Sequence, residues 1–223
     1  MKQQSYSRQV IGGDFELRSL SLGLVNKLLD YTHGISGTWT ASGRSALTLV
    51  LKELKNRGVN TVHVPAFLCN SILTPLTQLG LDYKFYPVDL DLKTYPDPSP
   101  GSAIIAIHYF GWLDESIFQL RSESGDRFHL IEDVTHALLS DWSTDSGVSR
   151  SVFLTPRKLG PVPLGGWCSV DVELEAPHRK IDSLAWQSLM ARLARSLYLE
   201  QDQLPIDSNF ENFYLSSFFR KWR

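Results

Sequence analysis

The sequence has few cysteines, nearly balanced charge and no long apolar run, and each shortage narrows what the protein can be. Its two cysteines, Cys69 and Cys168, are too few for a disulfide framework, so we expect a reduced, cytoplasmic setting. With 22 Lys and Arg against 24 Asp and Glu, the net charge of −2 favours neither nucleic acid nor an anionic membrane as a partner. The apolar stretch Ala103–Ile107 is too short to cross a bilayer and predicts a buried strand.

Two familiar motifs are also missing. No Gly-x-Gly-x-x-Gly motif supports the alternative that the chain is a nucleotide-binding α/β domain without any other cofactor. No apolar stretch follows the first residues, Met1–Ser5, so a signal peptide is not expected. What remains is a chain of 223 residues, 43% hydrophobic and 21% charged, which is enough to bury one sizeable core.

Apolar periodicity predicts strands and helices that alternate along most of the chain. Strands are expected near 61–65, 82–88, 103–108, 128–132, 151–155 and 166–172. Helices are expected near 20–29, 43–57, 70–79, 114–122 and 181–200. Pro96, Pro98 and Pro100 indicate a loop between two strands. This alternation predicts an α/β layer fold with a mostly parallel sheet.

Lys158 has an unusual setting, the segment 153–166, which contains three prolines and three glycines among apolar residues. Proline fixes the backbone, and glycine lets it turn tightly or approach a ligand closely. A lysine held there loses hydration, so its pKa falls and its amine becomes a nucleophile suited to Schiff-base chemistry. The alternative is a solvated or merely structural lysine.

Asp133 ends the apolar run that starts at Phe128, and this pattern predicts a buried strand with Asp133 at its carboxyl end. Ligands of open α/β sheets bind at the carboxyl ends of the strands. An aspartate in that position can hold a protonated ring nitrogen, which is the partner that pyridoxal phosphate (PLP) needs to act as an electron sink. The alternative is that Asp133 caps a following helix.

A third candidate element is a helix that begins at Ser42–Gly43 and is expected to end near Gly58. Its apolar positions follow the 3–4 spacing of a helix: Ala46, Leu47, Val50, Leu51 and Leu54. The free N–H groups and positive dipole end of such a start suit a phosphate group. The alternative is an ordinary serine N-cap.

In this order and spacing, the three elements resemble those of the DegT/StrS-type sugar aminotransferases, a family of fold-type-I PLP-dependent enzymes. The resemblance runs from about residue 11 to residue 170. It rests on Ser42–Leu47, Val62–Phe67, Leu79–Asp89, His108–Gly111, Ile131–Asp133 with His136, and Pro156–Lys158 with Gly165–Gly166. It implies a three-layer αβα large domain like that of aspartate aminotransferase.

Carried over residue by residue, the resemblance implies that Lys158 forms the internal aldimine with PLP. It implies that Asp133 pairs with the pyridine nitrogen and that His136 lies near the ring hydroxyl; no metal is expected. The phosphate would be held at Ser42, Gly43, Arg44 and Ser45, with a further hydroxyl from Thr155.

The chain departs from the family pattern at two positions. Arg44 replaces the common threonine, although a guanidinium also suits a phosphate. Cys69 stands where many family members stack an aromatic ring over the cofactor, and Phe67 is the nearest aromatic substitute.

We expect three regions along the chain: an entry segment over 1–40, a PLP-binding large domain over 41–175, and a C-terminal helix with an aromatic tail over 176–223. The tail, Phe210–Trp222, needs a cover, such as the core, a partner chain or a further domain. Members of the family continue into a small domain that closes over substrate. The chain is then either a fragment, with 176–223 the start of a truncated small domain, or a natural short form.

Two functions from different classes follow. The first is a PLP-dependent aminotransferase that moves an amino group from an amino-acid donor to a keto-sugar, which we expect to be nucleotide-linked. The second is a non-catalytic or regulatory relative that keeps the fold, with or without the cofactor. Fold-type-I relatives complete their sites across a homodimer interface, so we expect a homodimer.

Overall fold

The computed structural model describes residues 32, 34–112, 115–125, 127–142, 150–159, 162, 164–172, 186 and 189–190. The helix expected near 20–29, most of the helix expected near 181–200 and the aromatic tail over 210–222 lie outside these residues.

The described strands form one seven-stranded sheet in the order β1-β7-β6-β5-β4-β2-β3. The strands are β1 (Thr38–Thr40), β2 (Thr61–Pro65), β3 (Asp82–Tyr86), β4 (Ser102–Ile107), β5 (Phe128–Asp133), β6 (Arg150–Leu154) and β7 (Gly166–Cys168). Strands β2 to β6 are parallel, whereas β7 is antiparallel to both β6 and β1. The predicted mostly parallel sheet is confirmed.

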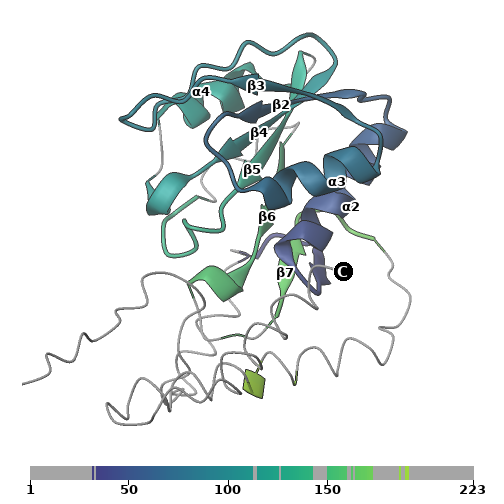
Figure 1. The fold of residues 1–223 in the computed structure, drawn as a ribbon, viewed down its shortest axis with the longest axis vertical. Helices are drawn as coiled ribbons and strands as arrows, with labels where there is room; N and C mark the ends of the chain where they lie inside the picture. The colour runs from purple at the N-terminus through teal and green to yellow at the C-terminus, as the bar shows by residue number, and fades with distance from the viewer. Residues whose placement is uncertain are drawn as a thin grey trace, which may run out of the picture.

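Helices cover both faces of the sheet. They are α2 (Gly43–Asn56), α3 (Leu73–Gln78) and α4 (Glu115–Glu123), with the short 3-10 turns η1 (Asn70–Ile72), η2 (Tyr109–Gly111) and η3 (Pro156–Lys158). Figure 1 shows α2 and α3 together on one side of the strands and α4 on the other. None of the described helices is long and apolar enough to cross a membrane.

Alternate side chains of β4 divide the core between the two faces, as the two-residue period of a strand requires. Ile105 packs in the cluster that contains the apolar face of α2. Its neighbour Ile104 packs with Ile117 and Leu120 of α4. Both faces of β4 are buried, and all of its residues after Ser102 are apolar, so the architecture is the expected three-layer αβα arrangement.

Helix α2 forms as its sequence predicts. Its five buried side chains are those with the 3–4 spacing, and the helix ends at Asn56, two residues before Gly58. Gly58 has a φ of +93°, a conformation that glycine adopts without steric cost. The Ser42 cap and Gly58 therefore fix the bounds of α2, and the apolar stripe fixes the face that it buries.

The structure differs from the prediction at three elements. Strand β1 was not predicted, because its three residues are too short to show a period. Strand β7 stops at Cys168 rather than 172, since the next residue, Ser169, bonds to Val152 through its side-chain oxygen as well as its backbone N–H. The helix expected over 70–79 begins as the 3-10 turn η1 and continues as α3. The loop containing the three prolines does join β3 to β4.

Candidate active site

The candidate residues meet at one edge of the sheet, where the parallel strands end. The last residue of β5, Asp133, lies between Ile107 of β4 and Phe153 of β6. Residues that follow these strands, His108 and Thr155, therefore lie beside it. Because β1 runs in the same direction as β6, it delivers the start of α2 to the same edge.

At the start of α2, Ser42 is an N-cap, as the alternative interpretation expected. Its hydroxyl oxygen accepts the N–H of Ser45 at 3.1 Å and lies 2.9 Å from the Ser45 hydroxyl. The first turn of α2 contains no acidic residue. The helix start therefore keeps its positive end uncompensated within its own first turn, which is what an anion site requires.

The loop after β6 packs tightly on this helix start. A Cβ atom on Gly43 would lie 3.0 Å from the Cβ of Thr155, and one on Gly166 would lie 2.3 Å from the Ser42 carbonyl. The Thr155 hydroxyl donates to the Gly165 carbonyl at 2.6 Å. Glycine at positions 43 and 166 thus lets the backbone at the start of α2 lie directly against Thr155 and the backbone of Gly166.

Lys158 is the last residue of η3 and is exposed. The expected desolvation of this lysine is wrong for this structure. In the single turn of η3, Pro156 takes the buried position, and exposure increases through Arg157 to Lys158. The apolar sequence around a lysine does not decide which side of a short turn carries its side chain.

The charge of Lys158 acts on two other candidate residues. Burial lowers the pKa of His136, and the positive charge of Lys158 lowers it further, against the opposing effect of Asp133. For Cys69, burial raises the pKa, but hydrogen bonds with Ser71 and the charges of Lys158 and Arg44 outweigh it, so the net pKa is lowered. These three groups therefore share one neighbourhood at the sheet edge.

Asp133 is a half-buried carboxyl whose pKa is raised by burial, even though hydrogen bonds from Thr135 and the nearby His136 and His108 oppose the shift. The Thr135 N–H donates to its Oδ1 at 3.0 Å. No helix follows over residues 134–142, so the alternative of a helix cap is wrong, and Asp133 instead holds a local turn. Among the described residues, Asp133 forms no ion pair.

Aromatic side chains stand next to these groups. Phe67 is 55% exposed, and its ring centroid lies 5.4 Å from that of the buried Tyr109. The Tyr109 hydroxyl donates to the Phe67 carbonyl, and burial together with the charge of Asp133 raises the Tyr109 pKa. Phe110 stacks on the ring of His136. Neither Tyr109 nor Phe110 was predicted from the sequence to have a role at the site.

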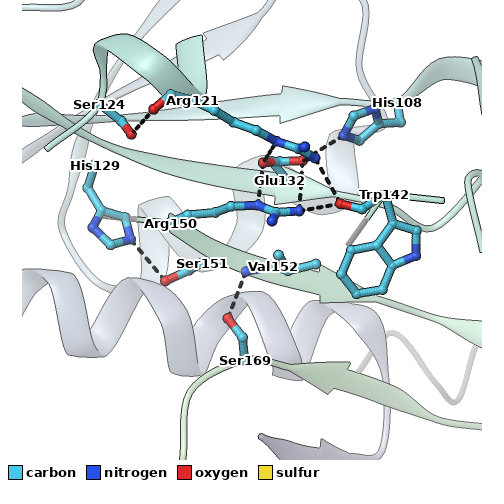
Figure 2. Close-up of polar contacts among 10 residues, drawn as sticks. All are labelled: His108, Arg121, Ser124, His129, Glu132, Trp142, Arg150, Ser151, Val152 and Ser169. Carbon is cyan, nitrogen blue, oxygen red and sulfur yellow. Dashed lines mark hydrogen bonds and ion pairs between the residues drawn. The ribbon is translucent and has the colours of Figure 1, made fainter. Parts of the chain in front are cut away.

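A buried ion cluster behind the strand end was also not predicted. Glu132 is fully buried and contacts His108 at 2.7 Å, Arg121 at 2.8 Å and Arg150 at 2.5 Å. Figure 2 shows its carboxylate between the two arginine side chains, both of which also donate to the Trp142 carbonyl. Two features of the sequence could have indicated this cluster. One is a glutamate inside an apolar strand, and the other is an arginine on the buried face of α4.

No protein-family model and no curated protein sequence matches the chain. Solved structures with the same fold are found at low identity. The sugar aminotransferase CalS13 from Micromonospora echinospora has 16% identity and a TM-score of 0.50, over 90% of this chain and 61% of that one. GDP-4-keto-6-deoxymannose-3-dehydratase, solved with bound GDP-perosamine, has 17% identity and a TM-score of 0.51, over 66% of this chain and 43% of that one. 3-Amino-5-hydroxybenzoic acid synthase has 18% identity and a TM-score of 0.50, over 72% of this chain and 46% of that one.

These likenesses define the fold class. The described residues have the architecture of the large domain of fold-type-I PLP-dependent transferases. Within that class, the structure is similar to the sugar aminotransferase type that the sequence motifs resemble. The chain spans less than two thirds of the length of each of the three structures.

Proposed function

We propose that the protein binds PLP and acts as an aminotransferase of the sugar type. The amino group would pass from an amino-acid donor to a keto-sugar, which we propose to be nucleotide-linked. The observation that carries the proposal is the meeting of three groups at one sheet edge: an exposed lysine, Lys158; a strand-end carboxyl, Asp133; and a helix start free of acidic residues at Gly43.

The residues present fit PLP on two counts. Burial raises the Asp133 pKa, and a protonated ring nitrogen would supply a positive partner that favours the ionised carboxylate and so opposes that shift. At the other end of the site, the start of α2 offers first-turn N–H groups that have no partner within the helix. The Ser45 N–H already donates to the Ser42 hydroxyl, so the Gly43 N–H is the better candidate for the phosphate.

Each side chain then has a defined task. Lys158 would hold the cofactor through its amine and later carry a proton to and from the carbon that bears the amino group. Asp133 would keep the proton on the ring nitrogen, and His136 would orient the ring at its hydroxyl. When bound, PLP supplies the electron sink for the negative charge that develops at that carbon. Phe67 and Cys69 would flank the ring.

The first experiment is an absorbance titration with PLP. We expect a visible band that borohydride reduces, and peptide mass analysis should then locate the reduced adduct on Lys158. The Lys158→Ala variant should lose the band. Lys52→Ala, which removes an exposed lysine from α2, is the matched control and should keep it. A band that survives in Lys158→Ala would refute this role for Lys158.

Turnover separates the two functions considered. Production of an amino-sugar from a nucleotide-linked keto-sugar and an amino-acid donor would support the enzyme. PLP binding without transfer to any keto-sugar would favour the non-catalytic relative.

A further inference from the structure

Phe110 has a backbone conformation that its side chain does not favour. Its φ is +53°, in the left-handed region, where a bulky residue is a genuine outlier. Such strain persists only where the surroundings determine the backbone, and it is concentrated at functional sites. The next residue, Gly111, also has a positive φ of +85°. The turn η2 therefore places two consecutive residues in the left-handed region.

Hydrogen bonds to three separate segments fix this turn. Before it, the His108 N–H donates to the Asp133 carbonyl at 3.1 Å. Within it, the Tyr109 hydroxyl donates to the Phe67 carbonyl. At its end, the Gly111 carbonyl accepts the Ser140 hydroxyl at 2.9 Å. A Cβ atom on Gly111 would lie 3.0 Å from the His136 carbonyl, so the turn also packs directly on the backbone that carries His136.

Burial does not account for the position of the Phe110 side chain, because this residue is 74% exposed. Its one ring contact among the described residues is with His136. The two ring centroids are 6.0 Å apart, and the ring planes differ by 15°. Stacked aromatic pairs at this separation are favourable, and they restrict rotation of both rings.

We propose that Phe110 is a positioning residue for His136: the left-handed turn holds the phenyl ring against the imidazole and so fixes the orientation of the imidazole at the sheet edge. His136 is half-buried and follows the turn at Asp133, so its backbone alone leaves its ring free to rotate. The stack removes that freedom. Only the step from a fixed imidazole to tighter PLP binding rests on the proposed function.

The direct test is NMR of the full chain without cofactor. The six histidines can be distinguished by comparison with a His136→Gln variant. We expect the His136 ring protons to be shifted by the ring current of the phenyl ring and to show NOEs to it. Phe110→Leu should remove the shift, and Phe110→Tyr should retain it. Phe85→Leu is the control, since Phe85 is also an exposed aromatic, 55% exposed, but makes an edge-to-face contact with Tyr83.

The second measurement is the PLP dissociation constant of the same variants. A lost aromatic pair of about 0.5–1.5 kcal/mol corresponds to a weakening of roughly 2- to 12-fold in Phe110→Leu. Phe110→Tyr and Phe85→Leu should bind PLP as tightly as the wild type does.

A His136 signal that is identical in wild type and Phe110→Leu would overturn the stack. A lost shift with unchanged PLP affinity would overturn the positioning role. Wild-type protein that forms no band with PLP would refute the proposed function, and NMR alone would then decide whether Phe110 orients His136.

Discussion

Gly166 lies so close to Ser42 that a Cβ atom on Gly166 would fall 2.3 Å from the Ser42 carbonyl carbon and oxygen. Real contacts of this kind do not occur, so any other residue at position 166 must push the backbones apart. The first residue of β7 and the N-cap of α2 thus form one packed unit. The proposed phosphate site depends on this unit, because Ser42 fixes the direction in which α2 starts.

Gly166→Ala should accordingly reduce stability. Overpacking of this kind costs roughly 1–3 kcal/mol in the free energy of unfolding, measured by urea denaturation. Gly43→Ala is the comparison, since its added Cβ would meet Thr155 at the milder distance of 3.0 Å, and it should cost less. Equal urea midpoints for wild type and Gly166→Ala would contradict the close approach.

Glu132→Gln should destabilise the protein and change its pH dependence. Loss of a buried charge that pairs with two arginines costs about 3–5 kcal/mol. Burial raises the Glu132 pKa, but the bonds with His108 and Arg121 and the charge of Arg150 lower it to about 2, from its usual 4.5. Because the folded-state pKa is depressed, this stabilisation is present above pH 4.5 and is lost as the pH falls towards 2.

Urea unfolding as a function of pH tests both parts of the Glu132 prediction. The wild type should lose stability between about pH 4.5 and 2, and Glu132→Gln should show a smaller dependence there. Glu123→Gln is the control, because Glu123 is exposed and its contact with Arg127 is 3.9 Å long. If both variants behave alike, the buried cluster does not hold the strand end.

Phe110→Gly should separate stability from function. Glycine at a φ of +53° relieves strain of roughly 1–2 kcal/mol. This gain is offset by the roughly 0.5–1 kcal/mol that glycine loses in chain entropy and by the roughly 0.5–1.5 kcal/mol of the lost stack on His136. We therefore expect a free energy of unfolding close to that of the wild type, together with weaker PLP binding. A loss greater than about 1 kcal/mol would show that the phenyl ring stabilises the fold itself.

The protein should form a homodimer. Three large apolar side chains are exposed on segments that follow the ends of β2, β4 and β5: Phe67 (55%), Trp112 (73%) and Leu139 (81%). Leaving such side chains in water forgoes roughly 1.5–3 kcal/mol each, which a second copy would recover. Light scattering at micromolar concentration measures the mass directly. A monomer that also turns over a keto-sugar would contradict the prediction.

The sequence predicted the elements whose signals are local. Helix α2 has an apolar stripe, a serine cap and a terminal glycine, so its bounds were predicted to within a residue. Strand β4 was equally clear, because its five residues after Ser102 are all apolar. Strand β1 was missed, because three residues such as Thr38–Thr40 pair only where the distant strand β7 offers an edge.

For the candidate site, the positions of residues on strands and helices could be predicted from the sequence, but the surroundings of their side chains could not. Asp133 lies at the strand end, as expected. Lys158 is exposed instead of desolvated, because side-chain direction in a single turn depends on tertiary packing. The partners of Glu132 come from α4, β6 and the residue after β4, and no local pattern joins them. The stack of Phe110 on His136 likewise depends on a backbone conformation that sequence rules assign to glycine.

The pairing of β1 with β7 has a consequence for the order of folding. Thr38 bonds to the carbonyl of Val170, and Ser36 to Asp171, across separations of 132 and 135 residues. Contacts between such distant residues carry a large loop-closure cost and form slowly. A nascent chain can complete β2 to β5 before residues 165–172 have been synthesised. The start of α2 therefore gains its final support only when β7 arrives, and the proposed anion site there should be among the last features that the folding protein completes.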